Sequence, residues 1–276
     1  MTDPIPERQA LTSVIRRQIL IPARPERVWH FLSTDDGWAA WWGPGSTIEA
    51  RPSGPVHIRY PNGQTAVGEV IEIEDRRRLA FTFGYNRANT PLAPGASIVE
   101  IKLEEIATGT RVLLTHLLPD APAARMHEAG WRYQLGLFGT LVSRDALGPD
   151  LVATIDAWHV AWAMTAPAER RERLRAVVTD DVVVSEPMAT LQSIADVDAW
   201  ISQVQSQMLA TVRRNGPPAL SGDLAVWDWV IESNDQPLAT GRSVGRFHAD
   251  GRMSEVAGFW LTGPPGLPTS VVEPDR

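Results

Sequence analysis

The tripeptide Gly148-Pro149-Asp150 lies near the middle of this 276-residue chain, between two segments in which apolar residues recur every three or four positions. Gly148 can end a helix, Pro149 disfavours helical geometry in the residue before it, and Asp150 can cap the helix that follows. The sequence therefore predicts a helix break and, at this length, two domains with separate cores. The expected ranges are a first domain at 13–147, a second domain at 150–262 and a flexible tail at 263–276.

Composition excludes several classes of protein. Without cysteine, the chain has no disulfide framework, thiol chemistry or thiolate metal site. Its 26 Lys and Arg residues are dispersed and the formal net charge is −7, so nucleic acid is not expected as a partner. No apolar run approaches the length of a membrane span, which favours a cytoplasmic protein with no membrane partner. The 6 histidines are far apart, and we expect neither a metal nor another cofactor.

The first half begins with a strand at residues 13–21 and two short helices, in the second of which Trp38, Trp41 and Trp42 share one face. Strand segments with a period of two follow, and a helix at 122–147 closes this half. The order predicts an antiparallel sheet that wraps around a long helix. Within one strand Glu69 has the spacing of the apolar positions, so either it points into a pocket or a bulge turns it to solvent, which we favour. The segment 87–96 is expected to be a mobile loop.

Four segments of this half carry a family resemblance, namely PERVWHFLSTDDGWAAWW, GEVIEIEDRRRLAFTF, SIVEIKLEEIATGTRVLLTH and GWRYQLGLFGTLV. Together they resemble the START-like (SRPBCC) superfamily, in the branch named after the activator of the heat-shock-protein ATPase. The resemblance implies a helix-grip fold whose cavity, between sheet and long helix, takes small apolar molecules. It places eight side chains on that cavity: Trp38, Trp41, Trp42, Phe81, Phe83, His116, Trp131 and Phe138. The residues alone also allow His116 to be a hydrogen-bonded core residue.

The second half begins with a helix whose apolar stripe contains Trp158 and Trp162. His159 lies at the edge of this stripe and Asp156 precedes it by one turn, so the pair is either a general base or an exposed helix-edge pair. Three long strands near the end predict a curved antiparallel sheet packed against helices. Two tryptophans of the first of these strands share one face: Trp227 and Trp229.

The segments DAWHVAWAMTAPAERRERLRAVVTDDVVVSEP, VWDWV and TGRSVGRFHADGRMSEVAGFW resemble the SnoaL-like group of the nuclear transport factor 2-like superfamily. The resemblance implies a cone-shaped α+β barrel with a pocket, a homodimer formed through the sheet and, in some members, acid–base chemistry. Ser243 stands where many relatives have an Asp, whereas Glu186 keeps a carboxylate before a proline. An enzyme built this way would use Glu186 and His159 as its acid and base. Six further side chains would hold an apolar substrate: Trp158, Trp162, Trp227, Trp229, Ser243 and Trp260.

Both halves are therefore expected to be α+β, and three functions stay open. The leading prediction is binding of a small hydrophobic molecule, apolar or aromatic, in one or both cavities, with catalysis unresolved. One alternative is an acid–base enzyme of the polyketide cyclase, isomerase or dehydratase type in the second half, and another is a co-chaperone-like protein-binding module in the first. The G-x-S-x-G match at residues 241–245 predicts no hydrolase, because it continues a strand instead of forming a strand–turn–helix.

Overall fold

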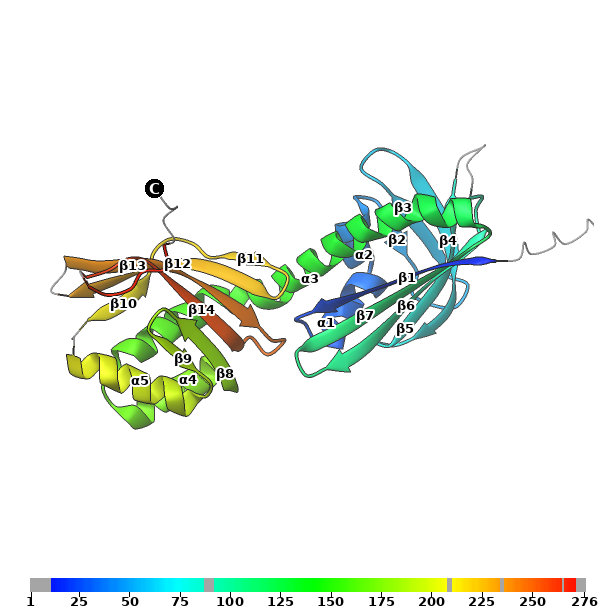
Figure 1. Cartoon of the computed structure of the whole chain (residues 1–276). Helices are drawn as coiled ribbons and strands as arrows, with labels where there is room; N and C mark the ends of the chain where they lie inside the picture. The colour runs from blue at the N-terminus through cyan, green and yellow to red at the C-terminus, as the bar shows by residue number, and fades with distance from the viewer. Residues whose placement is uncertain (1–10, 87–91, 208–209, 234–235, 265, 272–276) are drawn as a thin grey trace, which may run out of the picture. The chain divides into compact units, whose positions relative to one another are not determined.

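The structure is a computed structural model that describes residues 11–86, 92–207, 210–233, 236–264 and 266–271. Contacts between Cα atoms divide the chain into two compact units, Met1–Val142 and Ser143–Arg276, each of mixed helix and strand (Figure 1). The expected mobile loop at 87–96 and the expected flexible tail at 263–276 lie in part outside the described residues.

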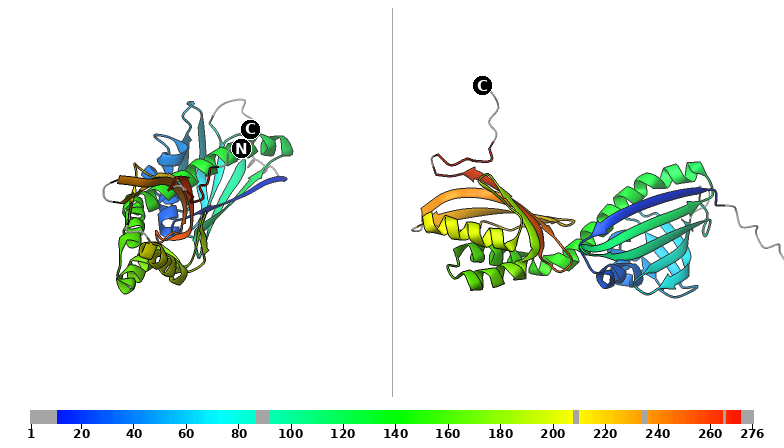
Figure 2. Two further views of the ribbon diagram at one scale, coloured as in Figure 1. Left: turned by 60° about the vertical axis from the view of Figure 1, so that its left-hand side comes forward. Right: turned by 60° about the horizontal axis from the view of Figure 1, so that its bottom comes forward.

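The first unit is an antiparallel sheet of 7 strands wrapped around the N-terminal part of the long helix α3 (Figures 1 and 2). The strand order is β1-β7-β6-β5-β4-β3-β2. In chain order its elements are β1 Ser13–Ile21, α1 Pro25–Ser33, α2 Asp35–Trp42, β2 Thr47–Ile48, β3 Pro55–Arg59, β4 Thr65–Glu74, β5 Arg78–Tyr85, β6 Ser97–Ile106, β7 Gly109–Leu118 and α3 Ala121–Ala163. The helix-grip arrangement predicted for this half is confirmed.

Local sequence signals explain how α2 and β4 form. The backbone N–H of Gly37 donates to the Thr34 hydroxyl at 3.2 Å, which caps α2 at its start. In β4 a register shift falls between Val70 and Glu72, and Val70 is buried whereas Ile71 is 44% exposed. Glu69 is exposed, so this strand does not keep the inward alternation that its apolar residues suggest.

The second unit packs a curved mixed sheet against helices (Figures 1 and 2). The strand order is β10-β12-β13-β14-β8-β9, with β11 paired to β12 and with β8 parallel to β14. In chain order the elements after α3 are α4 Pro167–Val177, β8 Val178–Glu186, β9 Ala189–Leu191, α5 Ile194–Gln207, β10 Thr211–Arg214, β11 Ala219–Ser221, β12 Leu224–Ser233, β13 Gln236–Phe247 and β14 Met253–Thr262. Within the described residues β10 and β9 do not pair with each other, so the predicted α+β unit is a curved open sheet packed on helices and not a closed barrel.

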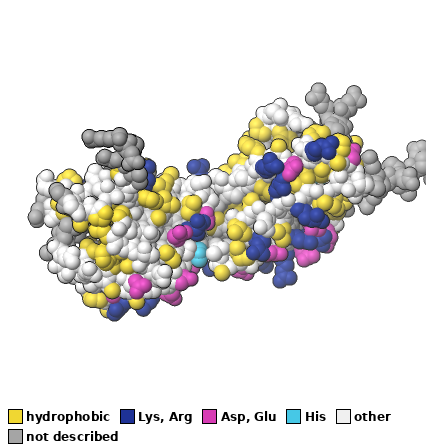
Figure 3. Space-filling view, in the orientation of Figure 1, with side chains coloured by type: hydrophobic (Ala, Val, Ile, Leu, Met, Phe, Trp, Pro, Cys, Tyr) yellow, Lys and Arg dark blue, Asp and Glu magenta, His cyan; other side chains and the backbone are white. Residues whose placement is uncertain are grey.

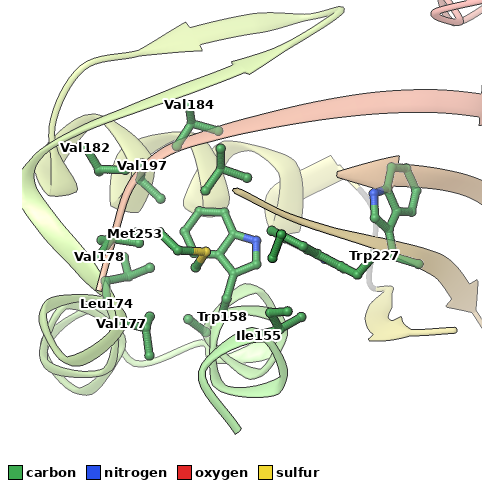
Figure 4. Close-up of a cluster of buried hydrophobic side chains, with 14 of the residues drawn as sticks. Ile155, Trp158, Leu174, Val177, Val178, Val182, Val184, Val197, Trp227 and Met253 are labelled. Atoms are coloured by element: carbon green, nitrogen blue, oxygen red, sulfur yellow. The ribbon is translucent and has the colours of Figure 1, made fainter. Parts of the chain in front are cut away.

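Trp158 lies in the core of the second unit (Figure 4). It comes from α3, one turn after Ile155, and shares its cluster with Leu174 of α4, Val197 of α5 and Met253 of β14. Because the cluster draws on three helices and the sheet, burial of this apolar face holds the elements together.

Helix α3 runs from Ala121 to Ala163 without the predicted break, and Pro149 lies inside it. Pro149 is exposed, while Leu147 and Leu151 on either side of it are buried in the second core. A proline interrupts the helical hydrogen-bond ladder, yet burial of the flanking apolar stripe outweighs this local cost. The expected break is therefore wrong, and the two compact units divide between residues 142 and 143.

Charges of both signs are interspersed on the face shown in Figure 3. Along the second sheet some charged side chains form ion pairs, for example Asp228 with Arg242 at 2.7 Å and Glu232 with Arg213 at 2.6 Å. Exposed pairs of this kind add little stability. Among the helices of the described residues, none combines the length and the apolar character needed to cross a membrane.

Candidate functional site

The first unit contains a cavity of about 1020 Å³, part of which is open to solvent. It is formed by residues from α2, the turn after β3, the end of β5 and the first part of α3. The lining residues are Trp41, Trp42, Tyr60, Pro61, Asn62, Gln64, Phe83, Tyr85, Met126, His127, Gly130, Trp131, Tyr133, Gln134 and Leu137. No Asp, Glu, Lys or Arg is among these described residues, so the cavity suits an uncharged ligand.

Trp42 forms the centre of the aromatic wall of this cavity. Its ring meets the edges of Tyr60 and Trp131, with 5.7 Å between ring centroids in both cases. The Trp42 indole Nε1 is buried and has no hydrogen-bond partner within the described parts of the chain. Burial raises the pKa of the Tyr60 hydroxyl, which stays protonated. The wall therefore offers flat apolar surface.

His116 supports this wall from behind. Its Nδ1 accepts a hydrogen bond from Trp131 Nε1 at 2.9 Å, and its Nε2 lies 2.8 Å from the Ser97 hydroxyl. Ser97 in turn donates to the backbone carbonyl of Phe83 at 2.9 Å. An indole N–H can only donate, so the proton of His116 is on Nε2 and donates to Ser97. Burial, with His127 nearby, lowers the pKa of His116 to about 3, which keeps the ring neutral.

His127 and Tyr85 form a second polar pair, which lines the cavity itself. Their rings stack, and the Tyr85 hydroxyl lies 3.0 Å from His127 Nε2. His127 Nδ1 lies 2.8 Å from the carbonyl of Ala123 and must donate to it, so Nε2 accepts from the tyrosine. Burial lowers the pKa of His127 and raises that of Tyr85, so both side chains are neutral near pH 7.

Four of the eight side chains predicted for this cavity line it, namely Trp41, Trp42, Phe83 and Trp131. The other four, Trp38, Phe81, Phe138 and His116, are fully buried and are not among the lining residues. Trp38 packs edge-on against Phe81 at 5.5 Å and donates to the carbonyl of His57, so its ring is occupied within the core. Trp41 packs against Phe138 at 4.9 Å in the same layer.

The second unit contains a smaller cavity of about 500 Å³, a volume that includes space open to solvent. It lies between the C-terminal part of α3 and the strands β8, β10, β12, β13 and β14. The lining residues are Trp158, His159, Trp162, Val184, Glu186, Val212, Trp229, Ile231, Ser243, Val256, Gly258 and Trp260. Unlike the first cavity, this one contains an ionisable carboxyl group.

Glu186 is the carboxyl group of the second cavity. Its Oε1 accepts a hydrogen bond from Trp200 Nε1 at 2.6 Å, and Trp260 is a further side-chain donor to it. Burial raises the pKa of Glu186, and the two indole hydrogen bonds oppose this only in part. A carboxylate with a raised pKa is a stronger base than an exposed one, so Glu186 is suited to exchange a proton with a ligand.

His159 lines the same cavity, and the residue is 4% exposed. Its Nε2 accepts from Trp227 Nε1 at 3.1 Å, while its Nδ1 has no partner within the described residues. Burial lowers the pKa of His159 to about 4; Asp156 opposes this shift and Arg214 adds to it. Asp156 itself pairs with Arg214 at 2.9 Å, so the expected Asp–His pair is replaced by an ion pair.

The structure brings Glu186 and His159 together on one cavity with five of the six predicted substrate contacts: Trp158, Trp162, Trp229, Ser243 and Trp260. The sixth, Trp227, is fully buried and donates a hydrogen bond to His159. Trp229 Nε1 donates to the Ser243 hydroxyl at 3.0 Å. Ser243 lies within β13, so the G-x-S-x-G match forms no nucleophile elbow.

Sequence reasoning missed three polar or small residues that matter here, Tyr85, His127 and Gly258. Tyr85 extends the apolar row of Phe81 and Phe83, and His127 precedes Trp131 by one helical turn, so the spacing of both residues could have predicted their place on the cavity. No feature of the sequence predicts the place of Gly258. A Cβ placed on Gly258 would lie 3.6 Å from Glu186 Cβ and 3.8 Å from Ser243 Oγ, so this glycine leaves space beside both.

In the described residues, no group of three His, Cys, Asp or Glu side chains is arranged to hold a metal ion. The structure thus defines a class of two-unit α+β protein in which each unit has a cavity rich in tryptophan.

Residues 22–143 match the model of the family described as activator of Hsp90 ATPase homolog 1-like protein. No curated protein matches the chain. One similar solved structure is the protein MLL2253 from Mesorhizobium loti, with 18% identity, a TM-score of 0.44 and coverage of 48% of this chain and 98% of the other. The Aha1 dimer from Colwellia psychrerythraea has 19% identity, a TM-score of 0.42 and coverage of 48% and 97%. A putative isomerase of the SnoaL-like family from Agrobacterium tumefaciens has 18% identity, a TM-score of 0.39 and coverage of 41% and 99%.

Proposed function

We propose that this protein binds small, uncharged aromatic molecules in its cavities, and that the first cavity is the principal binding site. The observation that carries the proposal is an aromatic wall around about 1020 Å³ with no charged side chain among its described lining residues. A ligand that buries roughly 200 Å² of apolar surface there, away from water, gains about 5 kcal/mol of favourable binding free energy before the costs of association. Micromolar binding is therefore within reach of apolar contact and one or two hydrogen bonds.

The test uses N-phenyl-1-naphthylamine, an uncharged aromatic dye whose fluorescence rises in apolar surroundings. Gly130 lines the first cavity, and a Cβ added to it would meet no atom within 4 Å, so Gly130→Leu fills space there. Gly136 lies on the same helix, is exposed and also has no atom near an added Cβ. Gly136→Leu is therefore the matched control for a helix glycine replaced by leucine.

We expect the wild-type protein and Gly136→Leu to bind the dye with equal affinity, and Gly130→Leu to bind it at least about tenfold more weakly. The reason is that a leucine side chain occupies volume that the dye needs. Absence of dye binding by the wild-type protein, or equal binding by all three proteins, would remove the first cavity as a ligand site.

Acid–base catalysis in the second unit is a second candidate, favoured by the raised pKa of Glu186 in a cavity that also contains neutral His159. Since Nε2 of His159 already accepts from Trp227, this histidine is suited to donate from Nδ1 and Glu186 is suited to act as the base. We therefore propose the same two residues as the acid–base pair, with histidine as the donor.

The assay follows exchange of the α-protons of 2-tetralone for deuterium in heavy water. Glu186 would remove an α-proton while the Nδ1–H of His159 holds the enolate oxygen, and return of a deuteron completes the exchange. Acceleration by the wild-type protein that is lost in Glu186→Gln supports this candidate. Exchange no faster than in buffer removes it. A homodimer formed through the second sheet stays a prediction, which analytical sedimentation would test. The co-chaperone-like alternative also stays a prediction, which an assay for stimulation of a chaperone ATPase would test.

A further inference from the structure

Two polar hydrogens of the second cavity have no acceptor in the described parts of the chain. They are borne by Nδ1 of His159 and Nε1 of Trp162, both atoms being buried. A buried donor without a partner is costly to leave unpaired. Each of these donors therefore gains from a ligand that brings an acceptor into the cavity.

The proton on Nδ1 of His159 is placed there by Trp227. The indole N–H of Trp227 can only donate, so Nε2 of His159, at 3.1 Å, must present its lone pair. A neutral imidazole with a lone pair on Nε2 carries its hydrogen on Nδ1. Trp227 is fully buried and does not line the cavity, so its effect on a ligand passes through the histidine.

The two donors share one side of α3. His159 and Trp162 are three residues apart on a continuous helix, and residues at this spacing are neighbours on a helix surface. Both line one cavity, which is partly open to solvent, together with the flat rings of Trp158 and Trp229. A flat ligand whose rings contact these tryptophans would lie on the same side of α3 as the two buried donors.

Glu186 restricts the charge of that ligand. It lines the same cavity, and its carboxyl group is surrounded by apolar residues and indole N–H groups instead of cationic ones. A ligand carboxylate would bring a second negative charge into the same buried space, which is unfavourable. A carbonyl oxygen accepts hydrogen bonds without adding charge.

We infer that the second cavity binds a flat aromatic molecule through an uncharged carbonyl oxygen, which accepts from His159 Nδ1–H and Trp162 Nε1–H. Trp227 is a positioning residue that sets the tautomer of His159. The inference rests on the proposal that the cavities bind small aromatic molecules, and it assigns the ligand class of the second one.

The test compares 2-acetylnaphthalene with 2-isopropenylnaphthalene, which has nearly the same shape but lacks the carbonyl oxygen. The quantity of interest is the ratio of their dissociation constants for the full chain, measured by titration calorimetry. Trp162→Phe removes an indole N–H that has no protein partner, so it leaves no protein group newly unpaired. Trp229→Phe is the matched control, because the Trp229 N–H in the same cavity is already bonded to Ser243.

We expect the preference for the ketone to fall about tenfold in Trp162→Phe and to stay nearly unchanged in Trp229→Phe. Because Trp162 lines the second cavity and not the first, a change of this ratio reports binding in the second cavity. An equal ratio in wild type and Trp162→Phe overturns the inference while binding itself stands. If neither naphthalene binds the wild-type protein, the proposed binding in this cavity fails as well.

A second readout needs no ligand. In ¹⁵N spectra of the imidazole of His159, we expect the wild-type ring to carry its proton on Nδ1 and Trp227→Phe to shift the population towards protonated Nε2. Phenylalanine keeps an aromatic ring in the core, so a purely structural role of Trp227 would leave the tautomer unchanged. A wild-type ring protonated at Nε2 would overturn the assignment of both residues.

Discussion

Trp131 Nε1 donates a hydrogen bond to Nδ1 of His116 across 2.9 Å, inside the first unit. The bond ties a residue of the cavity wall to a histidine that is wholly buried. The pKa of His116 is lowered from 6.5 to about 3 by burial, so the folded state takes up a proton later than the unfolded chain as pH falls. Stability is therefore complete above pH 6.5 and is lost as pH falls towards 3.

We predict that His116→Gln reduces this pH dependence. Glutamine can accept a hydrogen bond from Trp131 and donate one to Ser97, but it does not titrate. The variant therefore keeps both hydrogen bonds and loses the part of the pH dependence that comes from protonation of His116. Urea unfolding between pH 7 and pH 4 measures it, and the wild-type protein should lose roughly 3 kcal/mol more than the variant over that range. Parallel curves for the two proteins would contradict a neutral, buried His116.

Pro149 gives a prediction about the continuity of α3. It is exposed within the helix, so Pro149→Ala should restore a backbone N–H and raise the free energy of unfolding by about 1–3 kcal/mol. Gly148→Ala, at the exposed neighbour, is the control and should add only about 0.5–1 kcal/mol. Thermal unfolding measures both. A Pro149→Ala protein no more stable than wild type would mean that the helix is interrupted in solution.

Glu186 gives a prediction of opposite pH sign. Burial raises its pKa, so the folded state holds this proton to higher pH than the unfolded chain, and stability is lost as pH rises through the raised pKa. Glu186→Gln should therefore be more stable than wild type at pH 8, with the advantage vanishing below pH 4. Glu232→Gln is the control, because Arg213 lowers the pKa of Glu232 and the variant should be the less stable protein at pH 8. If the two variants changed stability at pH 8 in the same direction, the raised pKa of Glu186 would be contradicted.

The order of elements could be predicted because their signals are local. Period-two rows and helical stripes identified the strands and helices. The break at Pro149 was predicted from equally local signals and was wrong, since the burial of Leu147 and Leu151 depends on a core assembled from distant parts of the chain. Whether the second sheet closes on itself could not be predicted, because strand pairing at the edges of a sheet has no signal in a single strand.

The candidate site was predictable by residue type more than by position. The spacing of α2 put three indoles on one face, but only the contacts of Trp38 with the core decide that it is not on the cavity surface. The hydrogen bond from Trp227 to His159 spans 68 residues, and the one from Trp131 to His116 joins a helix to a strand. No rule of local spacing predicts such pairs, and they determine which ring nitrogen carries a proton.

The most direct test of the central claim is native mass spectrometry of the full chain purified from the cells that make it. We expect a small aromatic molecule bound to the wild-type protein and released under denaturing conditions. We also expect a reduced load in Gly130→Leu, which fills the first cavity, or in Gly258→Val, which fills space beside Glu186 and Ser243. Wild-type protein that carries no small molecule and also fails to bind N-phenyl-1-naphthylamine would contradict the claim that these cavities are binding sites.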